Sequence, residues 1–315
     1  MSRHRKKLMV SLPLLTGLVS CSAYSIYAQS ASENYSLITG YGGQFLGQGN
    51  AAVNGSQALK NVSCAPTAVA NGLSWLQAYG YSTDSSPLGA NPNNYATVNT
   101  LQTSFNTTVA NASQDPSILA GTQAWLANNP GTAPVNVVQT YIPSSQYLAN
   151  VLNANDGVQL GISWAAAPIA NNSSFTPNNG GHFVSLDSIN LNPSGNGTIG
   201  ILDPWGDGTD NGAGGYNAGT VGTQETLTVT TLNIIAGGVN SIAPGTYLEI
   251  TDPSPLGDFP QLPAGTGYAG ADGIGLIDLA QIETLSAVPE PSSLVISGLA
   301  SAGIGGFVLL RRRKV

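Results

Sequence analysis

The spacing of apolar residues predicts two helices in the first half of the chain. In the stretch NVSCAPTAVANGLSWL, apolar side chains recur at helical spacing with alanines between them, which predicts a buried helix from Cys64 to Tyr79. Pro66 falls in its first turn, where the missing N–H costs nothing. A second helix is predicted over Pro143–Asn153, with Ser144 or Ser145 as its N-cap.

Three apolar runs after the second helix predict β-strands. Gly157–Trp164 is predicted as a buried strand, a second strand is expected to open at His182, and a third to end at Asp203. The turn between the last two falls near Pro193–Gly195. A hairpin of this kind places His182 and Asp203 at the same end of adjacent strands, while the pattern leaves their register open.

The N-terminus carries an export signal. Basic residues precede an apolar run, and Ala28 completes a small-residue cleavage site, so residues 1–28 are predicted to be a secretory signal peptide handled by the Sec export machinery. The alternative is a lipoprotein signal, in which Cys21 becomes the lipid-bearing N-terminus.

The C-terminus carries a membrane-directed segment. Leu294–Leu310 holds no charged residue and as a helix would rise about 26 Å, enough for a thin bilayer. The basic residues 311–314 follow, which would remain on the cytoplasmic side. With VPEPSS before it, this arrangement resembles the PEP-CTERM sorting signal of Gram-negative bacteria. The resemblance implies a temporary anchor removed by a membrane exosortase; a permanent transmembrane anchor is the alternative.

Charge excludes one class of partner. All 16 acidic residues lie between Glu33 and Glu290, and Lys60 is the one basic residue between the two targeting segments. Such a surface repels nucleic acid, because it cannot neutralise phosphates. The chain is 42% hydrophobic, so it can bury a sizeable core and is not of disordered composition.

The scarcity of cysteine and histidine directs attention to two residues. Cys21 and His4 lie in the signal peptide, which leaves Cys64 and His182 as the only cysteine and histidine of the mature chain. No disulfide can form within it, and too few nitrogen and sulfur ligands remain for a zinc site. We expect no metal and no cofactor, and interpret the leftover cysteine as a candidate reactive thiol.

The predicted elements place that thiol in a suitable position. Cys64 begins a helix, where unpaired N–H groups and the helix dipole favour an anion, although free cysteines often only fill space in a core. A thiolate, an imidazole base and a carboxylate that orients the imidazole make a nucleophilic triad. Asp203 is the expected carboxylate, with Asp187 and Asp207 as competitors.

The segments SCAPTAVANGLSWL, GISW, GGHFVSLDSI and GILDPWG resemble the papain-like cysteine peptidases, and among them the IdeS/Mac immunoglobulin-degrading and bacteriocin-processing peptidases. The resemblance implies an α+β papain-like fold, in which a helical N-terminal half with the Cys at a helix start packs on an antiparallel β half bearing the His and Asp. It assigns Cys64 as nucleophile, His182 as base and then acid, and Asp203 as the orienting group.

These peptidases also supply an oxyanion-hole side chain upstream of the nucleophile. Papain uses a Gln and the IdeS family a Lys. Here Gln57, Lys60 and Asn54 are available. Gln57 is preferred, together with the backbone N–H of Cys64.

The sequence thus predicts four regions: a signal peptide (1–28), a peptidase domain (29–252), a Pro/Gly-rich linker (253–287) and a sorting signal (288–315). The expected function is a cysteine endopeptidase acting on a protein or peptide substrate, held briefly in the inner membrane and then at the cell surface or in the extracellular matrix. A non-catalytic adhesion protein of the biofilm matrix and a transglutaminase-like acyl transferase are the alternatives.

Overall fold

The computed structural model describes residues 29–32, 45–79, 95–131, 135–165, 169–206, 209–210, 216–237, 242–251 and 274–285. The predicted signal peptide and sorting signal lie outside the described residues, as does Asp207. The helices are α2 (Gln57–Lys60), α3 (Cys64–Tyr79), α4 (Tyr95–Ser104), α5 (Asp115–Asn128) and α6 (Ser145–Asn153). The strands are β1 (Gln29–Ser32), β2 (Val135–Tyr141), β3 (Gly157–Ala165), β4 (Ser173–Phe175), β5 (Pro177–Leu191), β6 (Gly197–Asp203), β7 (Thr209–Asp210), β8 (Tyr216–Asn217), β9 (Thr223–Gly237), β10 (Gly245–Thr251) and β11 (Ile274–Leu285).

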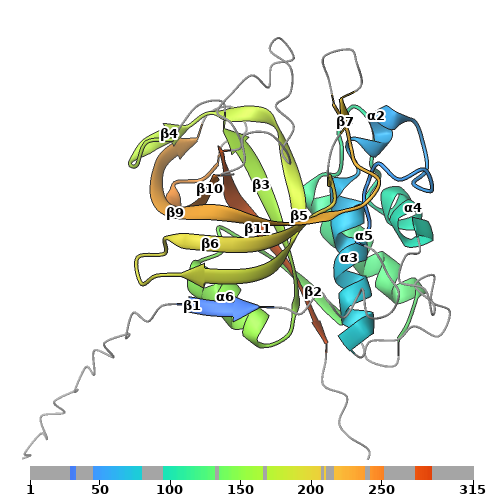
Figure 1. Cartoon of the computed structure of the whole chain (residues 1–315), viewed down its shortest axis with the longest axis horizontal. Coiled ribbons are helices and arrows are strands. Elements are labelled where there is room, and N and C mark those ends of the chain that lie inside the picture. The colour runs from blue at the N-terminus through green and yellow to red at the C-terminus, as the bar shows by residue number, and fades with distance from the viewer. Residues whose placement is uncertain are drawn as a thin grey trace, which may run out of the picture.

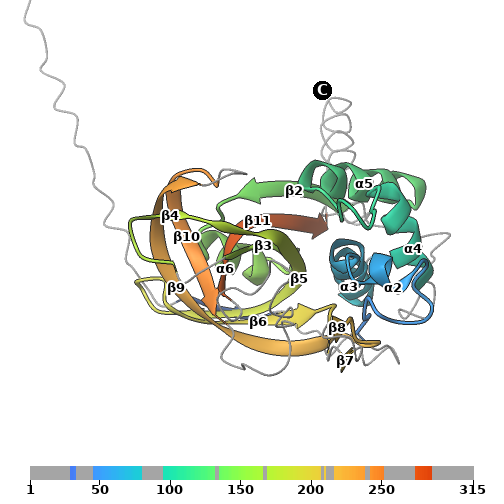
Figure 2. The ribbon, with the colours of Figure 1, turned by 90° about the horizontal axis from the view of Figure 1, so that it is seen from above.

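Six antiparallel strands form a closed barrel in the order β3, β5, β6, β9, β10 and β11, with β11 returning to pair with β3 (Figures 1 and 2). Strand β1 extends the sheet beside β5, β2 pairs with β11, and the short β4 runs parallel to β9. Strands β7 and β8 form a separate two-stranded sheet among the residues that the structure describes.

The predicted papain-like α+β fold is therefore wrong, because the fold is mostly β and centres on a closed barrel. The expectation failed at the strands that follow Asp203. Residues 274–285, assigned from their sequence to the Pro/Gly-rich linker, form the long strand β11. One edge of β11 pairs with β3, and its other edge pairs first with β10 and then with β2. The linker interpretation is wrong for these residues, because they close the sheet.

The barrel interior is an apolar core to which every barrel strand contributes. Its lower end is covered by α6, which lies inside the outline of the ring when seen along the barrel (Figure 2). Leu148 and Leu152, on one face of α6, are buried in this core. The helix predicted over residues 143–153 is confirmed, and Ser144 caps it by accepting a hydrogen bond from the N–H of Tyr147.

Helix α3 occupies the other main core, between the barrel and helices α4 and α5 (Figure 1). It has the predicted bounds, and residues 65–76 are all buried. A helix buried on all sides needs small residues where neighbours approach closely. A Cβ at Gly72 would lie 2.1 Å from the Gln159 side-chain nitrogen, and Ser185 donates from its hydroxyl to the backbone carbonyl of Ala68. These contacts seat α3 against β3 and β5.

The predicted hairpin is present between β5 and β6. Its turn spans Asn192–Asn196, where the Asn192 side chain accepts hydrogen bonds from two backbone N–H groups and Gly195 adopts a φ of +80°. A left-handed φ of this kind favours glycine. The predicted start of the second strand is wrong, because β5 begins at Pro177 and His182 lies within it.

A carboxyl group lies buried where β11 passes beneath α3. Glu283 is fully buried, and its partners are the amide nitrogens of Gln159 and Gln281, each at 3.5 Å. Burial raises the pKa of Glu283 to about 8, and the two amides offset only part of that effect. Gln159 Oε1 is also buried and has no hydrogen-bond partner among the described residues, so it is an acceptor available to a protonated carboxyl.

We predict that Glu283→Gln removes a pH-dependent part of the protein's stability. Because the folded state holds the Glu283 proton more tightly, its contribution is present below about pH 4.5 and is lost as the pH rises through about 8. Urea unfolding should show that the parent's free energy of unfolding falls by on the order of a few kcal/mol between pH 5.5 and pH 8.5. The fall should be smaller in Glu283→Gln. Glu249→Gln, at a partly exposed position on β10, is the matched control. Parallel pH dependences in parent and Glu283→Gln would contradict the prediction.

Candidate active site

Cys64 is the first residue of α3, and its thiol is free and partly exposed. The residue before it fixes the start of the helix. The buried Ser63 hydroxyl donates to the Leu59 carbonyl and accepts from the Gln102 amide, and the Ser63 carbonyl accepts the first helical hydrogen bond from Thr67. The N–H groups of the first helical turn have no acceptor within the helix, so the thiol lies where negative charge is stabilised.

His182 and Asp203 are in contact across the β5–β6 pair. Ser185 is paired with Leu202, so the register brings Asp203, the last residue of β6, beside the part of β5 that holds His182. His182 Nε2 lies 2.5 Å from Asp203 Oδ1, and both side chains are buried. The same carboxylate oxygen accepts the backbone N–H of Trp205 at 2.8 Å, which holds the carboxylate in place.

His182 also contacts Cys64. Burial alone would lower the pKa of His182, but the charge and hydrogen bond of Asp203 outweigh it, and the hydrogen bond and charge of Cys64 add to the effect, raising the pKa to about 10. Because Nε2 faces Asp203, Nδ1 is the ring nitrogen left for the thiol. The raised pKa favours the imidazolium form of His182 at neutral pH, with the Asp203 carboxylate and the Cys64 side chain as its partners.

The comparisons with known proteins bear on the C-terminus of the chain. Residues 287–314 match the PEP-CTERM protein-sorting motif. The match indicates a secreted bacterial protein that is anchored through its C-terminus and recognised and processed by an exosortase. No curated protein matches the chain. In the part of the chain that the structure describes, no helix has the length and apolarity needed to cross a membrane, and the predicted span Leu294–Leu310 lies outside that part.

The predicted oxyanion-hole residue lies close in sequence to Cys64 but is not bonded to it. Gln57 begins α2, and its amide nitrogen donates to Asn61 Oδ1 at 2.8 Å. No hydrogen bond among the described residues joins Gln57 to Cys64 or His182. The alternative Lys60 donates from its ammonium to the Asn50 carbonyl. The other alternative, Asn54, is exposed, and its backbone N–H donates to the Asn99 side chain.

The competing carboxylates are not brought to the imidazole. Asp187 lies at an irregularity of β5, between Leu186 and Ser188, and makes no hydrogen bond with His182 in the described part of the chain. Asp207 lies outside the described residues. Of the three carboxylates considered from the sequence, Asp203 is the one seen in contact with His182.

Two residues near the triad were missed by the sequence reasoning. Trp164 on β3 stacks on the His182 ring. Asn61 accepts hydrogen bonds from Gln57 and from the backbone N–H of Ala218, which ties the start of α3 to the segment before β9. Neither residue carries a sequence signal, because the contacts of Trp164 with His182 and of Asn61 with Ala218 join segments that are separated in the chain. In the described part of the chain, no three metal-binding side chains are grouped together.

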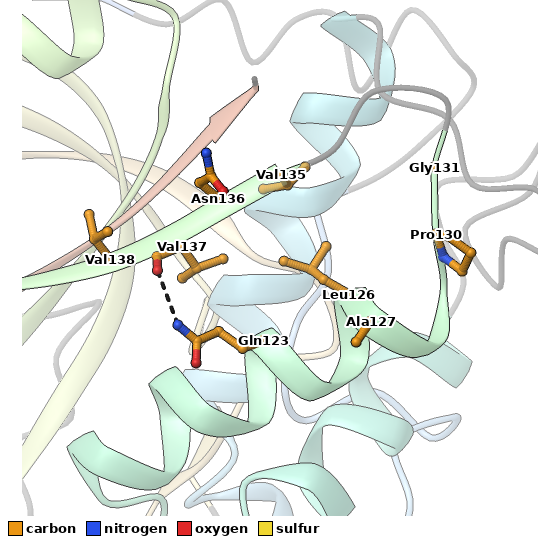
Figure 3. Close-up of a pocket in the computed structure, with 9 residues that line it drawn as sticks. All are labelled: Gln123, Leu126, Ala127, Pro130, Gly131, Val135, Asn136, Val137 and Val138. Carbon is orange, nitrogen blue, oxygen red and sulfur yellow. Dashed lines mark hydrogen bonds between the residues drawn. The ribbon is translucent and has the colours of Figure 1, made fainter. Parts of the chain in front are cut away.

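A separate pocket of about 570 Å³ lies between α5 and β2 (Figure 3). Leu126 and Val137 face one another across it, and Gln123 donates from its side chain to the backbone carbonyl of Val137 at 3.3 Å. The pocket shares no lining residue with the triad. The sequence pattern did not predict it.

We predict that Cys64 reacts with iodoacetamide at pH 6 at least about tenfold faster than it does in urea-unfolded protein, because a neighbouring imidazolium stabilises the thiolate. His182→Ala should reduce the rate to nearly that of the unfolded chain. In protein that begins at Gln29, Cys64 is the only cysteine, so the labelling is unambiguous. Equal, slow rates in the folded parent and His182→Ala would indicate an inert thiol.

We also predict that the sorting motif is removed after export. The exported protein should end between Val288 and Ser293, because the motif match begins at residue 287 and its Pro-Glu-Pro element follows directly. Intact-mass analysis of protein from the native host measures the new C-terminus. Recovery of mature protein that still carries residues 311–315 would contradict this prediction.

Proposed function

We propose that the protein is an exported cysteine endopeptidase in which Cys64, His182 and Asp203 form the catalytic triad. The contact chain from Asp203 through His182 to Cys64 is the observation that carries the proposal. His182 and Cys64 are the only histidine and cysteine left after the signal peptide, and they come from elements far apart in the sequence. A thiol beside a buried, carboxylate-held imidazole is the arrangement that nucleophilic catalysis requires.

The reaction follows from this arrangement. The Cys64 thiolate adds to the scissile carbonyl, and the C–N bond breaks as the His182 imidazolium gives its proton to the leaving amine. Water then attacks the thioester while His182 takes up its proton, releasing the carboxylic acid and restoring the thiolate–imidazolium pair. Asp203 keeps one tautomer and orientation of the ring throughout and stabilises its charged form.

The oxyanion formed in each step needs hydrogen-bond donors. The backbone N–H of Cys64 is in the first turn of α3 and suits this role. Gln57 stays the predicted side-chain donor. Its amide carries two hydrogens and gives one to Asn61, so the second is available if the side chain turns toward the substrate.

Proteolysis of a peptide library by the exported protein tests the proposal, and substitution of the carboxylates tests the role of Asp203. We expect Asp203→Asn to lower kcat/KM about 10- to 10⁴-fold, the range for a positioned acid–base group. Asp187→Asn, which removes a charge on the same hairpin without touching His182, should stay within about a few-fold of the parent. Thermal unfolding of each variant shows whether the fold is retained.

The outcomes separate the proposal from its alternatives. Cleavage that is lost in Cys64→Ser and in Asp203→Asn supports the endopeptidase. Transfer of the acyl group to an added amine, with no net hydrolysis, would replace it with an acyl transferase. If no library member is hydrolysed or takes part in acyl transfer, the catalytic proposal is overturned, and a non-catalytic surface protein is what remains.

A further inference from the structure

We propose that Trp164 is a positioning residue that holds the His182 imidazolium from its ring face, an inference that rests on the proposed function. The two ring centroids are 6.3 Å apart and their planes differ by 21°, which is an offset stack. An indole face attracts a cation placed over it, and the attraction is stronger where water is excluded. His182 is 8% exposed and Trp164 is partly buried, so the imidazole side of the contact lies largely out of water.

The stack completes the restraint of the ring. Asp203 holds the ring edge at Nε2, and the Cys64 side chain is a second hydrogen-bond partner of the imidazole. Edge contacts alone allow the ring to tilt about the line that joins them. Trp164 contacts the face of the ring, and so opposes this tilt.

The backbone of β3 is arranged for this contact. Ile162 is paired directly with His182 on β5, and the regular register is interrupted between Ser163 and Ala165, at Trp164. A bulge beside an active site commonly redirects a side chain. Trp164 is therefore a diagonal neighbour of His182, close enough for an aromatic side chain to reach across the pair of strands.

The strand on the other side of β3 leaves space for the indole. Trp164 is paired with Gly275 of β11, and a Cβ at position 275 would lie 2.9 Å from Trp164 Cε3 and 2.7 Å from Ile162 Cγ2. Any side chain at this position would push against both residues. The glycine thus permits the indole to lie where it meets His182.

The test compares Trp164→Leu with Trp164→Phe, which keeps an aromatic face. We expect Trp164→Leu to slow iodoacetamide modification of Cys64 at pH 6 by about 2- to 30-fold and to move the acidic limb of the pH–rate profile to higher pH. At pH 9, where a thiol ionises without help, the rates should converge. Trp164→Phe should retain most of the parent rate. On a cleavable peptide, kcat should fall by a similar factor while KM changes little.

Trp125→Leu on α5 is the matched control, because it removes a buried tryptophan from the apolar cluster against which Cys64 also packs and leaves the stack of Trp164 on His182 in place. A pH–rate profile of Trp164→Leu that superimposes on the parent profile would overturn the proposal. The proposal would also be overturned if the rate of Cys64 modification fell equally in Trp164→Leu, Trp164→Phe and Trp125→Leu, in proportion to the fall in their melting temperatures. Modification of Cys64 needs no peptide cleavage, so this measurement stands even if the parent hydrolyses no peptide, which would contradict the proposed function alone.

Discussion

The pairing of β11 with β3 on one edge and with β10 on the other makes the sheet continuous, and the other structural features depend on it. Leu279 of β11 joins Phe183 in the apolar cluster against which α3 packs. Gly275 of β11 gives Trp164 its place. The thiol and the imidazole therefore meet because a strand near the end of the folded chain supports both β3 and the helix.

Sequence reasoning succeeded where structure is determined locally. The bounds of α3, the cap of α6 and the Asn192–Asn196 turn follow from residues within one helical turn or one hairpin. The contact between His182 and Asp203 could be anticipated for the same reason, because a tight turn joins their strands. The scarcity of cysteine and histidine then indicated which thiol and imidazole to consider.

Non-local pairing accounts for the errors. Residues 274–285 follow a long Pro/Gly-rich segment, and nothing in their own pattern indicates that they pair with strands more than a hundred residues earlier. The bulge at Trp164 and the hydrogen bond from the Ala218 backbone N–H to Asn61 likewise depend on neighbours that only the tertiary structure supplies. A strand that closes a barrel is recognised by its partners, and these do not show in the strand itself.

Because basic side chains are scarce in this chain, the His182–Asp203 pair differs from the other carboxyl sites in having a partner that can carry a positive charge. Lys60 donates to a backbone carbonyl. The buried Glu283 therefore depends on glutamine amides, and the partly buried Asp278 on the Ser163 hydroxyl. Burial raises the pKa of Asp278 to about 6, with a further rise from Asp115. Carboxyl groups without a cation tend toward the protonated form, whereas Asp203 has an imidazolium to pair with.

The position of β11 in the chain also sets the order in which the fold can form. It is the last described strand, and the sorting motif begins two residues beyond its end. A chain exported from its N-terminus delivers β3 and β5 long before β11, so the barrel stays open until almost the whole chain has crossed the membrane. Barrel closure is also expected to be a slow folding step, because β11 and β3 are far apart in sequence. Because the contact between Cys64 and His182 depends on the strand that β11 supports, the same delay postpones that contact until most of the chain has been exported.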